Sequence, residues 1–258
     1  MDSNLKEKFI RLWRKYLDGA ELPIVFYYTE EAESAHMVKP PKGHRCVIAD
    51  LSTVRRGKSL CFNADSIGCG GGKKYFGYSH EIMPEFEYFL SCGIPGKLEG
   101  ERYKKSPELV KEAMKEMPGF RAPAKYIVFK PWDMLAEREE PDVVVFFARP
   151  DVLSGLFTLA NFDEADPNAV FAPFAAGCGS IVQYPYLEKG SQRPRGVLGM
   201  FDVSARPWVP EDFLTFSIPM KKFARMVKNM EESFLITPSW AKVGKRINQA
   251  EKGSQSQS

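Results

Sequence analysis

Short apolar runs alternate with amphipathic helical segments along this chain, which restricts it to folds in which helices pack against a sheet. The two clearest strands are expected at 125–130 and 142–148, where Val, Ile and Phe predominate. Further strands are expected at 22–28, 59–64, 195–202 and 214–218, and helices at 4–18, 45–56, 81–92, 106–118, 150–160 and 220–234. Because strands and helices alternate without a regular βαβ period, we predict an α/β fold, a mixed sheet with helices packed on it.

The length of 258 residues suits one large domain or two modest ones. No stretch of the sequence has the composition of an interdomain linker, so we predict a single domain over residues 1–248. The last residues, 249–258, are almost entirely polar and are predicted to be disordered. With 44% hydrophobic residues, a chain of this size needs no disulfide or metal ion to fold.

The net charge, the lack of long apolar runs and the number of cysteines indicate which classes of partner and which cellular compartment to expect. A net charge of +3 is too small to indicate a nucleic-acid partner. No apolar run reaches 18 residues, and the N-terminal segment has no signal-peptide core, so we expect no membrane partner and a cytoplasmic protein. The five cysteines, an odd number at irregular spacing, are then expected to be reduced thiols.

Two Gly-Cys-Gly segments resemble each other. Residues 68–75 read GCGGGKKY, residues 177–184 read GCGSIVQY, and each has a Tyr six positions after its Cys. The match covers few positions and chance is one explanation. The other is an internal duplication in which approximate symmetry relates the two turns and both face a shared cleft.

Cys69 is the first candidate for a catalytic residue. Glycines allow the backbone to approach a ligand closely, so Gly70 and Gly71 are candidate ligand-binding residues. A helix that starts after them would point N–H groups at an anion or a thiolate, and Lys73 would add positive charge. The alternative is a tight connection with a buried cysteine. The glycine spacing matches neither a P-loop nor a dinucleotide-binding motif.

A second group of candidates lies downstream. Cys178 is a candidate catalytic residue and Gly179 a candidate ligand-binding residue by the same argument, with a structural role again the alternative. Asp202 ends a predicted strand, and Arg206 follows four positions later. These two side chains either form an ion pair that orders the loop or contribute to ligand binding, with the Arg206 guanidinium gripping a carboxylate or phosphate.

Metal and acid–base signals are weak. No Cys-x-x-Cys occurs and the three histidines have no metal-ligand spacing, so no metal site is predicted, although scattered cysteines do hold some iron–sulfur clusters. His80 lies near the Cys69 turn and is a candidate base. The Gly-x-Ser-x-Gly motif of serine hydrolases is absent. The cofactor, if there is one, is unknown from the sequence.

Several segments together resemble the uncharacterised ArCR family, a domain of unknown function found in archaea and bacteria. The resemblance rests on Cys69 with Gly77, on VVVFFARPD followed by Gly177-Cys178, and on Gly199, Asp202 and Arg206 before Ile218-Pro219, and it covers roughly residues 20–235. It implies that Cys69, Cys178, Asp202 and Arg206 belong to one site, and it implies no activity. Here the Cys69 turn has an extra glycine and two lysines compared with the family pattern.

Two functions follow from these candidates. The first is an enzyme that uses a reactive thiol or a bound cofactor at a Gly-Cys-Gly-lined cleft and acts on a small anionic metabolite. The second is a non-catalytic protein that binds or senses a small anion. A separate, spatial prediction is that Cys69, Cys178 and Arg206 converge on one pocket at one edge of the sheet. In the alternative arrangement the cysteines are separate core residues and Arg206 pairs with Asp202.

Overall fold

The computed structural model describes residues 3–32 and 35–255 and contains one continuous sheet of eight strands. The strand order is β2-β3-β4-β1-β5-β8-β7-β6. All neighbouring strands pair antiparallel except the two edge pairs, β2 with β3 and β6 with β7, which are parallel. The strands are β1 (Ile24–Thr29), β2 (His36–Met37), β3 (Leu60–Phe62), β4 (Tyr126–Pro131), β5 (Val143–Ala148), β6 (Val170–Phe171), β7 (Gly196–Gly199) and β8 (Leu214–Pro219).

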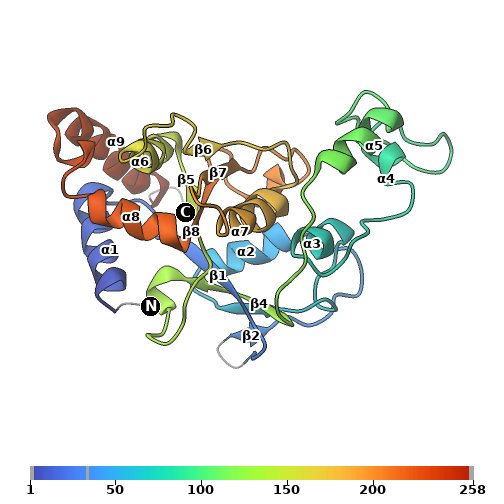
Figure 1. Ribbon diagram of the computed structural model, residues 1–258, viewed down its shortest axis with the longest axis horizontal. Helices are drawn as coiled ribbons and strands as arrows, with labels where there is room; N and C mark the ends of the chain where they lie inside the picture. Colours follow the sequence, from blue (N-terminus) through green and yellow to red (C-terminus); the bar gives the residue numbers. More distant parts are fainter. Residues whose placement is uncertain (1–2, 33–34, 256–258) are drawn as a thin grey trace.

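Helices cover both faces of this sheet, as expected for an α/β fold. On one face, α1 (Ser3–Tyr16), α6 (Pro150–Asn161), α8 (Met220–Asn229) and α9 (Pro238–Gln255) pack over side chains such as Val25 and Phe146. On the other face, α2 (Val47–Arg55), α3 (Gly70–Tyr75) and α7 (Tyr184–Glu188) cover side chains such as Phe26 and Phe129. Figure 1 shows the two groups of helices on opposite sides of the strands, with α4 (Phe86–Phe89) and α5 (Pro107–Glu116) projecting away from them.

The two halves of the sheet have the same topology. Strands β1–β4 are ordered 2-3-4-1 and strands β5–β8 are ordered 6-7-8-5, so β1 corresponds to β5, β2 to β6, β3 to β7 and β4 to β8. The registers also correspond, since Ile24 pairs with Pro131 as Val143 pairs with Pro219. At the centre, β1 and β5 pair antiparallel about the Val25–Val144 pair, which is the arrangement of an approximate twofold axis. The structure therefore supports an internal duplication.

The duplication does not relate the two Gly-Cys-Gly turns, so of the two explanations for their similarity the symmetric one is wrong. In each half a helical segment connects the two parallel edge strands, namely α2 in the first half and the π-helical turn η2 (Gly179–Gln183) with α7 in the second. Cys46 precedes α2, and Cys178 precedes η2. Cys178 thus corresponds in topology to Cys46, whereas Cys69 follows β3 and corresponds to the segment after β7 that holds Asp202.

Local signals in the sequence explain where the helices begin and end. Ser106 caps α5 by accepting the Leu109 N–H at 3.3 Å, with Pro107 at the first helical position. The helix expected at 81–92 is reduced to α4, because Pro84 disfavours helical backbone before it and Glu85 has φ 59°.

The C-terminal helix α9 extends to Gln255 and so includes much of the segment 249–258 for which disorder was predicted; residues 256–258 lie outside the described residues. Among the described residues, no helix is long and apolar enough to cross a membrane.

Candidate functional site

Cys69 lies half-buried at the start of α3. Its backbone is extended, and its sulfur accepts the N–H of Gly72 at 3.1 Å, so it is the N-cap residue of this helix. The glycine that follows is required by close packing, because a Cβ on Gly70 would lie 2.2 Å from the carbonyl oxygen of Ile82. Gly71 is different, since the nearest atom to an added Cβ is 3.8 Å away on the Tyr75 ring.

Cys178 is buried beneath this helix. Gly179, the residue after it, lies against the Tyr75 ring at the end of α3, where an added Cβ would be 3.1 Å from a ring carbon. Gly177, the residue before it, packs so closely on Met200 that a Cβ would lie 2.8 Å from the sulfur. Small residues on both sides of Cys178 therefore let α3 and η2 pack together, and this contact brings the two Gly-Cys-Gly turns side by side.

This juxtaposition has a different geometric origin from the one predicted. Cys69 follows β3 and Cys178 lies between β6 and β7, strands that belong to opposite halves of the sheet and are not neighbours. The turns meet because α3 and η2 fold over the same face, near the axis that relates the two halves. The symmetry-related contact, between α2 and the short helix η3 (Arg206–Trp208), is also present.

Asp202 fastens the loop after β7 to the Cys178 turn. One carboxylate oxygen accepts the N–H of Gly177 at 2.9 Å, and the other accepts the N–H and the hydroxyl of Ser204 at 3.1 and 2.8 Å. Hydrogen bonds to a charged group are stronger than neutral ones, so Asp202 positions this turn.

Arg206 does not join the cysteines. Its guanidinium donates to the backbone carbonyls of Pro210, Glu211 and Phe213, with lengths of 3.3 Å to Pro210 and 2.6 Å to Glu211. Its own N–H donates to the carbonyl of Asp202 at 3.1 Å. The predicted convergence of Arg206 with the two cysteines is therefore wrong, because the loop before β8 uses its guanidinium donors.

A third cysteine belongs to the cluster and was not singled out from the sequence. Burial raises the pKa of Cys46, and the nearby charges of Cys69 and Asp202 raise it further, while the N–H groups of Ile48 and Ala49 act in the opposite direction. Burial also raises the pKa of Cys178 well above its ordinary value, with added contributions from Cys69, Asp202 and Cys46. The signal available in the sequence was its position, because Cys46 lies at the start of the helix predicted at 45–56.

These couplings define what we call the thiol cluster, which consists of Cys46, Cys69, Cys178 and Asp202. Negative charge on any member raises the cost of negative charge on the others. Cys46 and Cys178 are consequently neutral thiols at neutral pH. Cys69 is half-buried like Cys46, whereas Cys178 is buried. Within the described part of the chain, no group of three or more His, Cys, Asp or Glu side chains is arranged to hold a metal ion.

Several cations and exposed apolar side chains lie close in sequence to members of the thiol cluster, or contact such neighbours. Lys73 is half-buried in α3, and Lys104 lies over the Phe174 ring with its nitrogen 4.2 Å from the ring centroid. Phe174 precedes the Cys178 turn and is 68% exposed, while Phe201 and Val203, on either side of Asp202, are 55% and 68% exposed. His80, the candidate base, is exposed.

Comparison with curated proteins and with solved structures finds no match for this chain. A comparison with protein-family models finds one that covers residues 14–229, which is most of the sequence and includes the whole thiol cluster. The model is described as uncharacterised ArCR, the family expected from the sequence motifs. The chain therefore belongs to the uncharacterised ArCR family.

Proposed function

We propose that this protein is an enzyme that uses the Cys69 sulfur as a nucleophile on a small anionic metabolite. The observation that carries the proposal is the position of this sulfur within the thiol cluster, at the N-cap of α3. It is less buried than Cys178, and it accepts the Gly72 N–H at 3.1 Å. A sulfur that attacks as a thiolate carries negative charge, and an N–H donor directed at it stabilises that charge.

The neighbouring groups support this assignment. Cys46 and Cys178 remain protonated, so they do not compete with Cys69 for negative charge. Asp202 acts as a positioning residue, since its oxygens bind Gly177 and Ser204 and fix the turn beside Cys69. Lys73, four residues after Cys69 in the same short helix, supplies positive charge, which suits an anionic substrate.

The chemistry follows from these roles. After the thiol proton passes to solvent, the sulfur lone pair forms a bond to an electrophilic carbon of the substrate, and the bonding pair of the broken bond departs with the leaving group. Water then displaces the sulfur and supplies the proton that restores the Cys69 thiol.

Alkylation with iodoacetamide, followed residue by residue with peptide mass spectrometry, tests the proposal. Cys92 serves as an internal reference because it is an exposed thiol outside the cluster. We expect Cys69 to react at least about tenfold faster than Cys92 at pH 7, with Cys46 and Cys178 slower than both. Cys69→Ser removes the fast phase. A Cys69 that reacts no faster than Cys92 contradicts the proposal.

The second candidate function is non-catalytic binding or sensing of a small anion. It is favoured by the surroundings of Cys69, because among the described residues no hydrogen bond joins the Cys69 sulfur to the candidate base His80 or to the Asp202 carboxylate. This function predicts ordinary alkylation of Cys69 together with a thermal stabilisation by millimolar inorganic phosphate that Lys73→Gln abolishes.

A further inference from the structure

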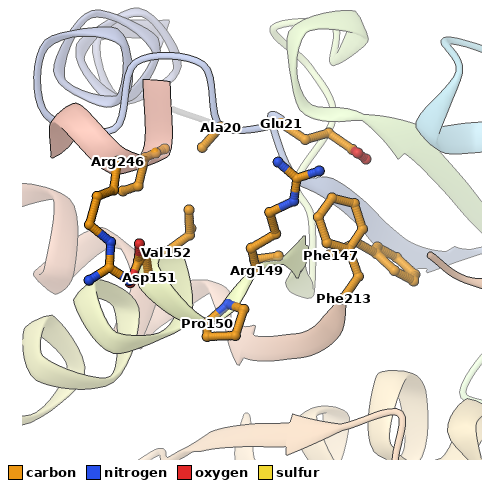
Figure 2. A pocket seen from close by; sticks show the side chains of 11 residues that line it. Ala20, Glu21, Phe147, Arg149, Pro150, Asp151, Val152, Phe213 and Arg246 are labelled. Carbon is orange, nitrogen blue, oxygen red and sulfur yellow. The ribbon is translucent and has the colours of Figure 1, made fainter. Parts of the chain in front are cut away.

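A cavity separate from the thiol cluster lies where β5 passes into α6. It has a volume of about 170 Å³ and is open on one side. The residues that line it come from distant parts of the chain, namely the segment between α1 and β1, the β5–α6 junction, the segment before β8, and α9. Figure 2 shows Arg149 and Arg246 on two sides of the hollow, with the Phe147 and Phe213 rings beside Arg149.

The walls are apolar over most of their area, with charges gathered at the rim. Phe147, Phe213, Val152 and Ile247 contribute rings and aliphatic groups, and Ala20 leaves space opposite them. Such walls suit a ligand with a small planar or aliphatic body, since burying apolar surface is the main source of affinity in a concave site.

The charged groups define the head of that ligand. Arg149 Nε pairs with Asp212 at 2.6 Å, and the Arg149 guanidinium carbon lies 5.5 Å from the centroid of the Phe213 ring. Arg246 pairs with Asp151 at 2.7 Å. A guanidinium presents donors in a planar fork that matches a carboxylate, and an aromatic ring beneath it holds this plane in position.

Asp212, one of the partners of Arg149, holds the guanidinium weakly. Its side chain is 45% exposed, so solvent screens its attraction to the guanidinium. In addition, α6 begins at the cavity with Pro150 as its first residue and no side-chain cap, so its positive end faces the same space. A ligand carboxylate placed there interacts with Arg149 and with the start of a twelve-residue helix.

From these features we infer that this cavity binds a small monocarboxylate with an apolar body, held by the Arg149 guanidinium beside the Phe213 ring. The site does not include any member of the thiol cluster, so it stands independently of the proposed function. Its ligand is either a second substrate-like metabolite or a regulator, and in both cases the recognised group is the carboxylate.

Isothermal titration of the full chain with benzoate tests the inference, with benzamide as the neutral analogue of the same shape. We expect benzoate to bind with a dissociation constant of about 1 mM or tighter and benzamide to bind at least about tenfold more weakly. Equal binding of the two, or no binding of benzoate at 10 mM (roughly ten times the expected constant), overturns the inference.

Two variants place the binding in this cavity. Arg149→Lys keeps the charge and loses the planar fork, and it should weaken benzoate at least about fivefold. Its matched control is Arg195→Lys, because Arg195 also pairs with a carboxylate (Glu188, 2.7 Å) and lies 4.1 Å from a phenylalanine ring centroid, but it is outside the cavity. Ala20→Leu should fill the space and abolish binding while circular dichroism shows an unchanged fold. Affinity unchanged by either cavity variant, or lowered as much by Arg195→Lys, refutes the assignment.

The experiment also separates this site from the thiol cluster. Cys69→Ser should leave the benzoate affinity within about twofold of the original value. If benzoate binds and Cys69 is unreactive, the proposed function is wrong and this site is retained. If Cys69 is reactive and benzoate does not bind, this site is refuted and the proposed function is retained.

Discussion

The two halves of the sheet share one backbone plan and differ in the residues that occupy it. Tyr27 and Lys130 in the first half correspond in register to Phe146 and Ile218 in the second. The first pair forms a buried network, in which Tyr27 and Lys130 both contact Glu139 Oε1, at 2.7 and 2.5 Å. At the corresponding place in the second half the residues are apolar. Strand pairing therefore tolerates either a polar or an apolar core at these positions.

The segments after β3 and β7 differ more. In the first half this segment leads through Cys69 into α3 and the projecting α4–α5 region, whereas in the second half it is the shorter loop with Asp202 and Arg206. Cys46 and Cys178 hold corresponding positions, yet Cys178 is the more deeply buried of the two. The duplicated scaffold thus brings four segments to one place, and each half supplies different chemistry there.

Breaking the buried network should have the largest effect. Lys130→Ile copies the residue of the second half but leaves the buried carboxylate of Glu139 without its cation. We expect a loss of about 3–5 kcal/mol in the free energy of unfolding, measured by urea denaturation followed by tryptophan fluorescence. The double variant Lys130→Ile/Glu139→Gln, which removes both charges, should recover at least about half of that loss. A single variant that loses less than about 1 kcal/mol would show that the network contributes little.

Cys61 in the first half corresponds in register to Leu198 in the second. Of these two positions, only the one in the first half should therefore make the free energy of unfolding depend on pH at high pH. Burial raises the pKa of Cys61 to about 11, above its ordinary value of 9.0. The unfolded chain then loses this proton at lower pH than the folded protein, so the stabilising contribution is present below pH 9 and is lost as the pH rises through 11. The difference between Cys61→Val and the unaltered protein in urea denaturation should change by at most about 2–3 kcal/mol over this range. A pH-independent difference would contradict the assigned burial.

Asp65 and Asp202 occupy corresponding positions in the two halves, because each lies three residues after the end of its strand, β3 and β7 respectively. Asp202→Ala removes the bonds to Gly177 and Ser204 and should cost about 1.5–3 kcal/mol in thermal or urea unfolding. Asp65 is exposed, so Asp65→Ala should change stability by less than about 0.5 kcal/mol. Equal effects of the two substitutions would mean that the second loop is not fastened as described.

The smallest expected effects distinguish the glycines within the Cys69 turn. An alanine at position 70 would collide with the carbonyl of Ile82, so Gly70→Ala should cost about 1–2 kcal/mol. Gly71 has room and lies within α3, so Gly71→Ala should be neutral or stabilise by up to about 1 kcal/mol. Differential scanning calorimetry of both variants measures the difference, and a reversed order would rule out this packing.

The sequence was informative where one segment determines its own structure. The apolar runs of β4 and β5 and the Ser106-Pro107 helix start identified those elements closely, because strand burial and helix capping are local. The edge strands β2 and β6 could not be predicted, since two residues show no periodicity. The repeat was predicted from the wrong residues, because it is a repeat of topology, and Leu60–Phe62 has little in common with Gly196–Gly199.

Site prediction met the same limit. Contact between α3 and η2 brings the turns of Cys69 and Cys178 together, so the edge-of-sheet argument for their proximity was wrong, and a pocket shared by the two cysteines stays a prediction. Cys46 was missed because its coupling to Cys69 depends on tertiary packing. The Arg206 guanidinium binds backbone carbonyl groups four to seven residues further along the chain. No sequence motif indicates these hydrogen bonds, so they could not be predicted.

The central pairing of β1 with β5 has a consequence for the ancestry of the fold. Two segments that pair antiparallel about the Val25–Val144 pair have the geometry of an isologous interface, the kind that joins identical subunits. A chain of half this length, with four strands, would build the same sheet as a homodimer, and every substitution in it would occur twice. Fusion into one chain removes that constraint, so the first half is free to carry Lys130 and Cys69 while the second carries Ile218 and Asp202.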